Sequence, residues 1–355
     1  MKKIVSRLSA AVLWGDASRE ARSLRTPGGR EMQRYSIVVL ATSVPLYFMA
    51  VNFFGLHVLL MAGTALAASL ATELLFSLVR KKPVHGNSLP FALLTGLLLP
   101  AWVVVTRGDG VDVAVNMPLW VVASGAAFGT VIGKEIFGGY GDHIFCPALV
   151  AKGFVVWSFP KMVQLPGDNP VLIEHKAGVW MGHLPVERVN LFSSGELTVC
   201  FIIVGLAGLA MILVNFRNLF TLIGIFAAGL GMACLFGGIE GMQVSDGITA
   251  MDAYFSLPLG ERWQWLAKPS GFILSGGFFF GACLLACDPA VNPRRCFGSL
   301  LYGLLIGVFA VSMRQMSSLP YSTMMSAILV ASLFAPLIDA LSPSLIEDTG
   351  VNDEK

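Results

Sequence analysis

Residues 57–79 read HVLLMAGTALAASLATELLFSLV, an apolar stretch with one charged side chain, Glu73. Its length is that of an α-helix that crosses the hydrocarbon core of a bilayer. The whole 355-residue chain has the same character, since 55% of its residues are hydrophobic and only 13% are charged. A soluble domain carries about a quarter charged residues, and backbone groups in lipid must be hydrogen-bonded within their own segment. The sequence therefore predicts an all-α polytopic membrane protein.

About ten stretches meet the same length criterion. They cover residues 36–54, 57–79, 89–106, 117–137, 143–160, 197–214, 219–237, 270–287, 297–313 and 318–340. Arginine and lysine concentrate in four connections, RSLRTPGGREMQR, VRKKPVHG, NFRN and NPRRC. All four lie on one face of the membrane when the N-terminus is cytoplasmic, as the positive-inside rule requires. Both termini are then expected in the cytoplasm, and the long loops 161–196 and 238–268 are expected outside.

This layout predicts a cytoplasmic N-terminal arm over residues 1–35, a transmembrane domain over 36–341 and an acidic cytoplasmic tail over 342–355. The start of the arm also fits a signal peptide, but no small-residue cleavage site follows its short apolar run cleanly. Five spans precede the 161–196 loop and five follow it, which predicts two inverted five-helix halves. Inverted repeats place a binding site at mid-membrane, between broken or glycine-rich segments.

The six cysteines lie mostly inside apolar spans, where cysteine behaves as a small hydrophobic residue. Cys283 and Cys287 are one helical turn apart and are placed to share a face, but the sequence has no CxxC pair, so no metal site is predicted. The formal net charge of +2 gives no reason to expect nucleic acid as a partner.

Three acidic residues are candidates for an ion path. Glu73 lies inside the second span, where an ionisable side chain faces a partner or a cavity; the alternative is a pair with Arg80 or Lys81. Glu135 belongs to the stretch GKEIFGGYGDHIFCPALV at 133–150. Asp288, in ACDPAVNPRRCFG at 286–298, either lies at the mouth of an ion path or pairs with the arginines that follow it.

The 133–150 stretch also predicts a ligand pocket. Gly138, Gly139 and Gly141 allow the backbone to bend and a flat ligand to approach closely. Pro147 then opens the next helix. The alternative is a tight cytoplasmic turn that the packing of the helices requires.

A polar patch, SDGITAMDA at 245–253, lies in the loop that is predicted to face outward. Asp246 and Gly247 precede Thr249 in this patch, so the threonine hydroxyl is expected to be accessible from outside the cytoplasm. The alternative is an ordinary turn that caps a short helix beginning near Ile248.

Taken in order, these stretches resemble one family, NqrB/RnfD, which is the membrane subunit shared by sodium-pumping NADH:quinone reductases and Rnf electron-transport complexes. The matching pieces are TPGG before the first span, the E-x-x-F-x-x-x-R-K end of the second, TGLLLP in the third, GKEIFGGYGDHIFCPAL, ACDP with GSLLYGLLIGVFAVSMR, and AILVASLFAPLIDA in the last. The resemblance covers roughly residues 25–340.

The resemblance implies electron transfer through flavins in a ten-span subunit of the bacterial cytoplasmic (inner) membrane. One FMN is joined to a threonine of an outward loop, riboflavin lies within the membrane, and quinone docks near the double glycine, here Gly138 and Gly139. It also implies partners, namely the other subunits of an Nqr- or Rnf-like complex, including an FMN-bearing extracytoplasmic subunit. The sequence has no GxGxxG motif and no cysteine cluster, so NADH or ferredoxin oxidation is expected in those partners.

This chain departs from the family pattern at the flavin attachment site. The family's threonine belongs to the loop between the fifth and sixth spans, but the 161–196 loop contains no threonine, and Thr198 is the nearest one. DGIT occurs two spans later, on the same predicted face. Either Thr249 carries covalent FMN in a lengthened loop, or this member has lost covalent flavin and DGIT is a turn.

Smaller departures occur near the other implied sites. Cys146 stands where the family has asparagine, Cys287 where threonine is usual, Ser332 where asparagine is usual, and PYST at 320–323 replaces a proline-x-glycine turn. Each replacement removes a hydrogen-bonding side chain or a flexible point. Three readings follow: a flavin-bearing redox subunit of an ion-translocating complex, a channel or transporter without flavin, and a scaffold subunit that has lost its cofactors.

Overall fold

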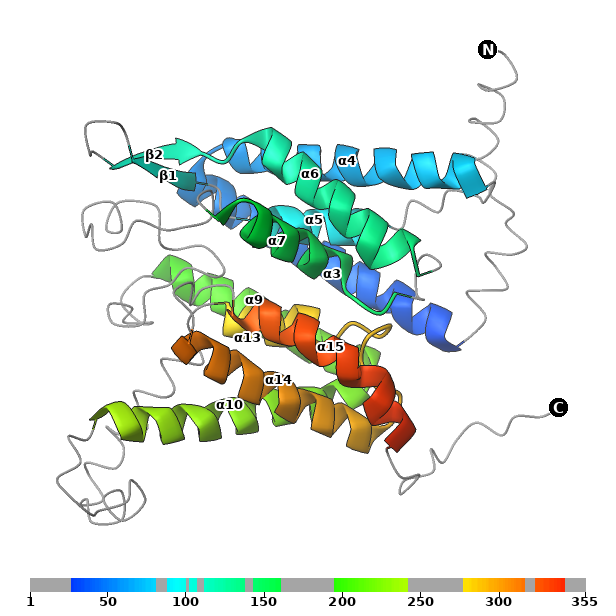
Figure 1. The fold of residues 1–355 in the computed structure, drawn as a ribbon, viewed down its shortest axis with the longest axis vertical. Helices are drawn as coiled ribbons and strands as arrows, with labels where there is room; N and C mark the ends of the chain where they lie inside the picture. The colour runs from blue at the N-terminus through cyan, green and yellow to red at the C-terminus, as the bar shows by residue number, and fades with distance from the viewer. Residues whose placement is uncertain are drawn as a thin grey trace.

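The computed structural model describes residues 27–80, 88–99, 102–106, 112–137, 143–160, 195–241, 277–316 and 323–341. These residues are mostly helical, and Figure 1 shows the helices side by side in one body. The candidate residues Gly138, Gly139, Gly141, Asp246, Gly247 and Thr249 lie outside the described residues.

The first part of the chain forms helices up to residue 158, in the order α3 (Pro27–Phe54), α4 (His57–Arg80), α5 (Leu89–Leu98), α6 (Leu119–Thr130) with a π-helical extension η1 (Val131–Glu135), and α7 (Pro147–Ser158). Pro147 opens α7, as the sequence predicts, because proline at the first helical position loses no hydrogen bond that the helix would use. The bend between α3 and α4 is made at Gly55, whose φ of 78° suits glycine.

The second part of the chain forms α9 (Gly195–Val214), α10 (Arg217–Gly241), α13 (Phe278–Phe280) with a π-helical segment η4 (Gly281–Leu285), α14 (Cys296–Met316) and α15 (Thr323–Leu341). Four helices are long and apolar enough to cross a membrane among the residues described, within Arg30–Asn52, His57–Arg80, Cys296–Met313 and Thr323–Leu341. Shorter apolar helices accompany them at Leu89–Leu98, Pro147–Ser158, Ile202–Val214 and Arg217–Ala233.

The third predicted span, 89–106, is wrong in its second part, and the protein is not purely α-helical. Helix α5 ends at Leu98, and β1 (Trp102–Thr106) pairs antiparallel with β2 (Asp112–Asn116) in the register Trp102↔Asn116. Leu99 precedes a proline and is extended, with φ −83° and ψ 142°, because the proline ring disfavours the helical conformation of the residue before it. The valine-rich sequence that follows favours a strand.

The eighth predicted span, 270–287, is also shorter than expected in its described part. Gly277 is left-handed with φ 71°, the helical turns of α13 and η4 follow it, and regular structure stops at Leu285. Asp288 and the proline after it then start an irregular segment that leads to α14. Helices α5 and α13/η4 are therefore both too short to cross a bilayer.

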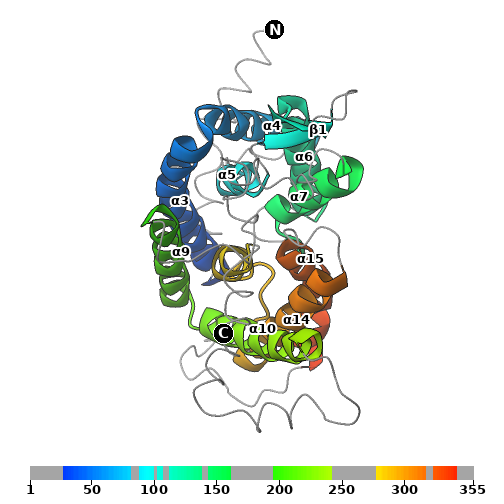
Figure 2. The ribbon, with the colours of Figure 1, turned by 90° about the vertical axis from the view of Figure 1, so that its left-hand side faces the viewer.

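The two short helices lie inside the body, and the long ones surround them. Figure 2 shows α5 enclosed by α3, α4, α6 and α7, and the yellow segment α13/η4 enclosed by α9, α10, α14 and α15. The packing partners agree with the view: α4 contacts α6, α6 contacts α7, α10 contacts α14, and α14 contacts α15. The two groups meet where α3 contacts α9 and α7 contacts α15.

Small residues bring the helix backbones close together. A Cβ added to Gly224 of α10 would lie 2.6 Å from the Leu300 carbonyl oxygen and 2.8 Å from the Leu304 nitrogen of α14. At Gly129 of α6 an added Cβ would lie 2.5 Å from the Pro147 carbonyl oxygen of α7. Helices in lipid associate through such close contacts, because burying apolar side chains gives them no hydrophobic driving force.

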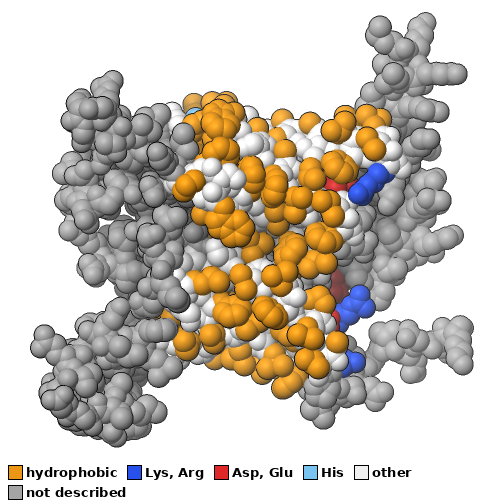
Figure 3. Space-filling view, in the orientation of Figure 1, with side chains coloured by type: hydrophobic (Ala, Val, Ile, Leu, Met, Phe, Trp, Pro, Cys, Tyr) orange, Lys and Arg blue, Asp and Glu red, His pale blue; other side chains and the backbone are white. Residues whose placement is uncertain are grey.

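The outer surface is apolar around the helices and charged at one end. Figure 3 shows hydrophobic side chains over the described part of one face, with Lys and Arg gathered at the right-hand end. Phe48 on α3, Trp157 on α7 and Leu213 on α9 are at least 70% exposed. Exposed apolar side chains on this scale are what a helix surface in contact with lipid requires.

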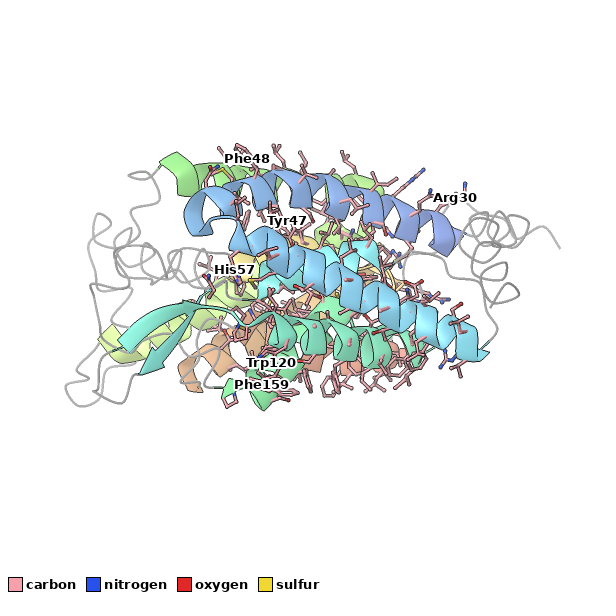
Figure 4. All side chains as sticks on the ribbon, turned by 90° about the horizontal axis from the view of Figure 1, so that it is seen from above. Arg30, Tyr47, Phe48, His57, Trp120 and Phe159 are labelled. Carbon is pink, nitrogen blue, oxygen red and sulfur yellow. The ribbon has the colours of Figure 1, made fainter. Side chains whose placement is uncertain are left out.

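Trp120 and Phe159 lie toward the end opposite to Arg30, as Figure 4 shows. Their rings meet edge to face, with centroids 5.2 Å apart. Tyr47 points inward from α3, and its hydroxyl donates to the Leu93 carbonyl of α5 over 2.6 Å. This bond fixes the short central helix α5 to the surrounding helix α3, because a buried hydroxyl needs an acceptor within the protein.

Candidate functional site

The first buried polar group is the Lys134 cluster, made of Lys134, Glu73, Ser88 and Glu135. The Lys134 Nζ donates to the Ser88 Oγ over 2.7 Å and lies 3.2 Å from Glu73 Oε2 and 3.8 Å from Glu135 Oε1. Ser88 in turn donates to Glu73 Oε2 over 2.5 Å. The side chains of Lys134 and Glu73 are only 2% and 5% exposed. Two carboxylates thus surround one buried ammonium.

Local structure explains how this cluster assembles. Ser88 precedes α5 and makes no capping bond to its own helix, so its hydroxyl is available to Glu73. Lys134 and Glu135 come from η1, where the wider π-helical turn continues α6. Such π-helical turns are rare and occur frequently at functional sites.

Arg80 connects the cluster to the outside. Its guanidinium donates to the Glu135 backbone carbonyl and lies 3.9 Å from Glu135 Oε2. The Arg80 side chain is 33% exposed and that of Glu135 is 11% exposed. The predicted pairing of Glu73 with Arg80 is therefore wrong: Glu73 pairs with Lys134, a residue from a helix that is distant in sequence, and Lys81 lies outside the described residues.

The second group is the His143–Asp288 pair. The His143 Nε2 lies 2.9 Å from Asp288 Oδ2, and both side chains are fully buried. The other Asp288 oxygen accepts the backbone N–H of Ala290 over 3.1 Å. His143 stands just before α7 and Asp288 just after η4, so this pair joins the two groups of helices. The predicted pairing of Asp288 with Arg294 or Arg295 is wrong, because Asp288 is turned into the protein and both arginines are exposed.

Two buried polar atoms without a hydrogen-bond partner lie in this pair and beside it. The His143 Nδ1 and the Tyr302 hydroxyl are buried and have no hydrogen-bond partner in the structure. Tyr302 of α14 and Cys146, at the start of α7, both lie close to Asp288. Unpaired buried polar atoms are uncommon in folded proteins and call for an explanation, such as a bound group or an ordered water.

Helix α5 links the two groups. Ser88 belongs to the Lys134 cluster, and Phe91, one turn later, meets the His143 ring edge to face with centroids 5.2 Å apart. The candidates Glu73 and Glu135 therefore share one cluster, whereas Asp288 lies in the other. Cys146, Cys283 and Cys287 are free thiols and are buried, as expected for cysteine used as a small hydrophobic residue.

A third network involves Arg217, which sequence reasoning used only to assign topology. The Arg217 guanidinium lies 2.8 Å from Glu31 Oε2 of α3 and donates to the Pro293 carbonyl over 3.2 Å. Asn292 then donates to Asn218 over 2.9 Å. These contacts join α3, the α9–α10 turn and the segment before α14. The NFRN string at 215–218 could have indicated this network, since two asparagines beside an arginine at the end of an apolar helix supply several hydrogen-bonding groups.

Within the described ranges, no group of three or more His, Cys, Asp or Glu side chains is arranged to hold a metal ion. The flavin and quinone candidates Thr249, Asp246, Gly247, Gly138, Gly139 and Gly141 lie outside those ranges, so they stay predictions.

Comparison with known proteins matches one family model and relatives that all carry the same name. The model of the NQR2, RnfD, RnfE family matches residues 23–346. The B subunit of the Na(+)-translocating NADH-quinone reductase of Azotobacter vinelandii (strain DJ / ATCC BAA-1303) is 31% identical over 288 residues, which covers 75% of this chain and 62% of that protein. The proteins of the same name from Pseudomonas aeruginosa (strain LESB58) and Chromohalobacter salexigens are 30% identical, with 75% of this chain covered. The chain spans about three fifths of the length of these relatives.

Proposed function

The chain belongs to the NQR2, RnfD, RnfE family, and from this premise we propose that it is a membrane subunit of an ion-translocating electron-transport complex. It passes electrons through bound flavin toward quinone or another membrane acceptor. The observation that carries the proposal is the family match over most of the chain, joined with ionisable side chains buried among apolar helices. Such side chains in a membrane interior mark ion or substrate paths by default.

The proposed architecture is about ten transmembrane segments in two inverted halves. In its support, α3, α4, α5, α6 and α7 pack on one another in the same way as α9, α10, α13/η4, α14 and α15, except that the contact of α5 with α6 has no counterpart. In Figure 1, α4 ends at the right-hand side, whereas its counterpart α10 ends at the left. The broken helices α5 and α13/η4 occupy equivalent places, where transporters of inverted-repeat design hold their ligands. With the basic end of Figure 3 in the cytoplasm, both termini are cytoplasmic.

The proposed ion path begins at Glu135, which is partly exposed beside Arg80, and continues to Glu73 through Lys134. Asp288 is more deeply buried and lies in contact with His143. The names of the relatives specify Na⁺, and we extend this ion to the present chain as part of the proposal. Arg80 and Lys134 together balance the charges of Glu73 and Glu135, so the proposed path begins at a cluster of paired charges with no net formal charge.

The proposed cofactors are FMN, attached to Thr249, and riboflavin in the membrane. The residues present fit a flat ring with polar edges in one respect: His143 Nδ1 and the Tyr302 hydroxyl are buried polar atoms without a hydrogen-bond partner in the protein. A bound flavin would supply one- and two-electron chemistry, while the protein supplies position and field. The chain's residues orient the ring edge and exclude water from it. NADH or ferredoxin oxidation is assigned to partner subunits, including one that carries FMN outside the cytoplasm.

The test is a denaturing gel of the purified chain, read for flavin fluorescence, with wild type, Thr249→Val and Thr198→Val compared. We expect a fluorescent band that disappears in Thr249→Val and persists in Thr198→Val. Mass spectrometry of the peptide that carries residues 238–262 should then show the flavin adduct. A band that persists in Thr249→Val rules out that attachment site.

A channel or transporter without flavin is the second candidate. The enclosed, broken helices α5 and α13/η4 favour it, since this arrangement is typical of solute paths. A complex purified gently from its own membranes distinguishes the two. A yellow, redox-active preparation supports the redox subunit, whereas a colourless one that passes small solutes through liposomes supports the channel.

A further inference from the structure

Lys152 is a buried cation that neither polar cluster uses. It lies in the middle of α7, only 3% exposed, between Leu149 and Val156 on a buried helix face. Its ammonium makes no hydrogen bond and no ion pair with any residue that the structure describes. A charged group in the interior of a membrane protein is strongly destabilised unless it is paired.

The other buried lysine, Lys134, has partners that Lys152 lacks. Lys134 is as deeply buried as Lys152, at 2% against 3% exposure, but it has a carboxylate at 3.2 Å and a hydroxyl at 2.7 Å. Arg217 is likewise paired, with Glu31. Lys152 thus differs from both paired cations of the described chain, and its Nζ is not among the fully buried atoms that lack a partner, so it borders accessible space from which a ligand can supply the acceptor.

Helix geometry fixes the direction in which Lys152 faces. Ala151 and Val155 pack on α6, where they meet the positions that Cβ atoms at Gly129 and Gly125 would occupy. Gly153 faces Leu329 of α15. At 100° per residue, Lys152 points between these two directions, toward the interior of the body, where α7 contacts α5. Figure 2 shows α5 in this enclosed place.

The surroundings restrict the kind of ligand. Ala148, Leu149 and Val156 flank Lys152 on the same buried face and offer no further donor. A phosphate or a halide ion in such surroundings needs several donors, whereas an apolar ring with a carbonyl oxygen needs one. Ring carbonyls of this kind belong to quinones and to isoalloxazines, which share this chemistry.

We propose that the Lys152 ammonium donates a hydrogen bond to the ring carbonyl oxygen of a redox ligand, a quinone or a non-covalent flavin, held between α7 and α5. The inference rests on the proposed redox function and adds a positioning residue to it. Reduction of the ring increases the negative charge on that oxygen, which a neighbouring ammonium stabilises. Lys152 therefore makes the bound ring easier to reduce as well as holding it.

The experiment compares the complex purified from native membranes as wild type, Lys152→Arg, Lys152→Gln and Lys152→Met. Endogenous flavin and quinone are extracted and quantified per polypeptide, and the bound ring is titrated anaerobically with dithionite. A lost charge-assisted hydrogen bond weakens binding by about 10- to 100-fold. We expect Lys152→Met to lose the ring or, at a fixed potential, to hold about a tenfold lower ratio of reduced to oxidised ring. Lys152→Arg should retain the wild-type ring content and the wild-type ratio of reduced to oxidised ring. In Lys152→Gln the ring should stay bound but be harder to reduce.

A stability measurement makes the inference independent of the loaded complex. If Lys152 is retained for a ligand, Lys152→Met removes an unpaired buried charge, so the ring-free protein should unfold no earlier than wild type. Earlier unfolding, or unchanged ring content and titration in Lys152→Met, would overturn the inference. Flavin content and quinone content separately identify which ring is bound. A wild-type complex that contains neither flavin nor quinone contradicts the proposed function itself. A bound ring whose content and reduction are unchanged in the Lys152 variants contradicts only this inference.

Discussion

Replacing Lys134 by Met tests whether the Lys134 cluster stabilises the fold as a charged unit. The Lys134 ammonium lies 3.2 Å from Glu73 Oε2, and a unit charge pair at this distance attracts by about 5 kcal/mol at an effective dielectric constant of 20. Desolvation of both groups offsets much of this, but removal of one partner leaves the other charge buried and unpaired. We therefore expect Lys134→Met to lower the free energy of unfolding by about 3–5 kcal/mol.

The double variant Glu73→Gln/Lys134→Met distinguishes the energy of the Glu73–Lys134 contact from the other effects of each substitution. It leaves no buried charge at Glu73, and the new amide can still accept from Ser88, so we expect a loss of only about 1–2 kcal/mol. Arg34→Met is the matched control, because Arg34 is an exposed cation on α3 and its loss should change stability by less than about 0.5 kcal/mol. Equilibrium unfolding in mixed micelles with increasing dodecyl sulfate, followed by tryptophan fluorescence and circular dichroism, measures wild type, the single variants Lys134→Met and Glu73→Gln, the double variant and Arg34→Met.

Two results would refute this reasoning. If Lys134→Met unfolds within the error of Arg34→Met, the buried ion pair does not stabilise the fold. If the double variant loses as much as the sum of the two single variants, Glu73 and Lys134 act independently, and the 3.2 Å contact carries no coupling energy.

Two other substitutions test the contacts between helices by the same unfolding measurement. His143→Phe leaves the Asp288 carboxylate buried without its partner and should lower the free energy of unfolding by about 3–5 kcal/mol. His143→Asn keeps a hydrogen-bond donor and should lower it by less. Equal losses in the two variants would show that the 2.9 Å contact between His143 and Asp288 does not stabilise the fold. Gly224→Ala should cost about 1–3 kcal/mol, since its Cβ would lie 2.6 Å from a carbonyl of α14. Gly231→Ala on the same helix has nothing within 4 Å and should stabilise by up to about 1 kcal/mol, and a loss there would contradict the packing argument.

Some of the site was predictable from local sequence. Glu73, Glu135 and Asp288 stood out because an acid is conspicuous in an apolar stretch, and all three are buried. Pro147 indicated the start of α7. The ends of α5 and α13/η4 were missed, although Leu99 before a proline and the glycine at 277 carried the signal. A criterion of apolar length does not detect such breaks.

The sequence by itself determined that the chain is a bundle of membrane helices with a few buried acids, because hydropathy and helix length follow from composition along the chain. Only the tertiary structure decided which group each acid meets. Glu73 pairs with Lys134 rather than with Arg80, which is nearer in the sequence, and Asp288 pairs with His143 rather than with Arg294. In an apolar interior a charge needs a partner within a few ångströms, and which residues come that close depends on how distant helices pack, a fact that no local pattern records.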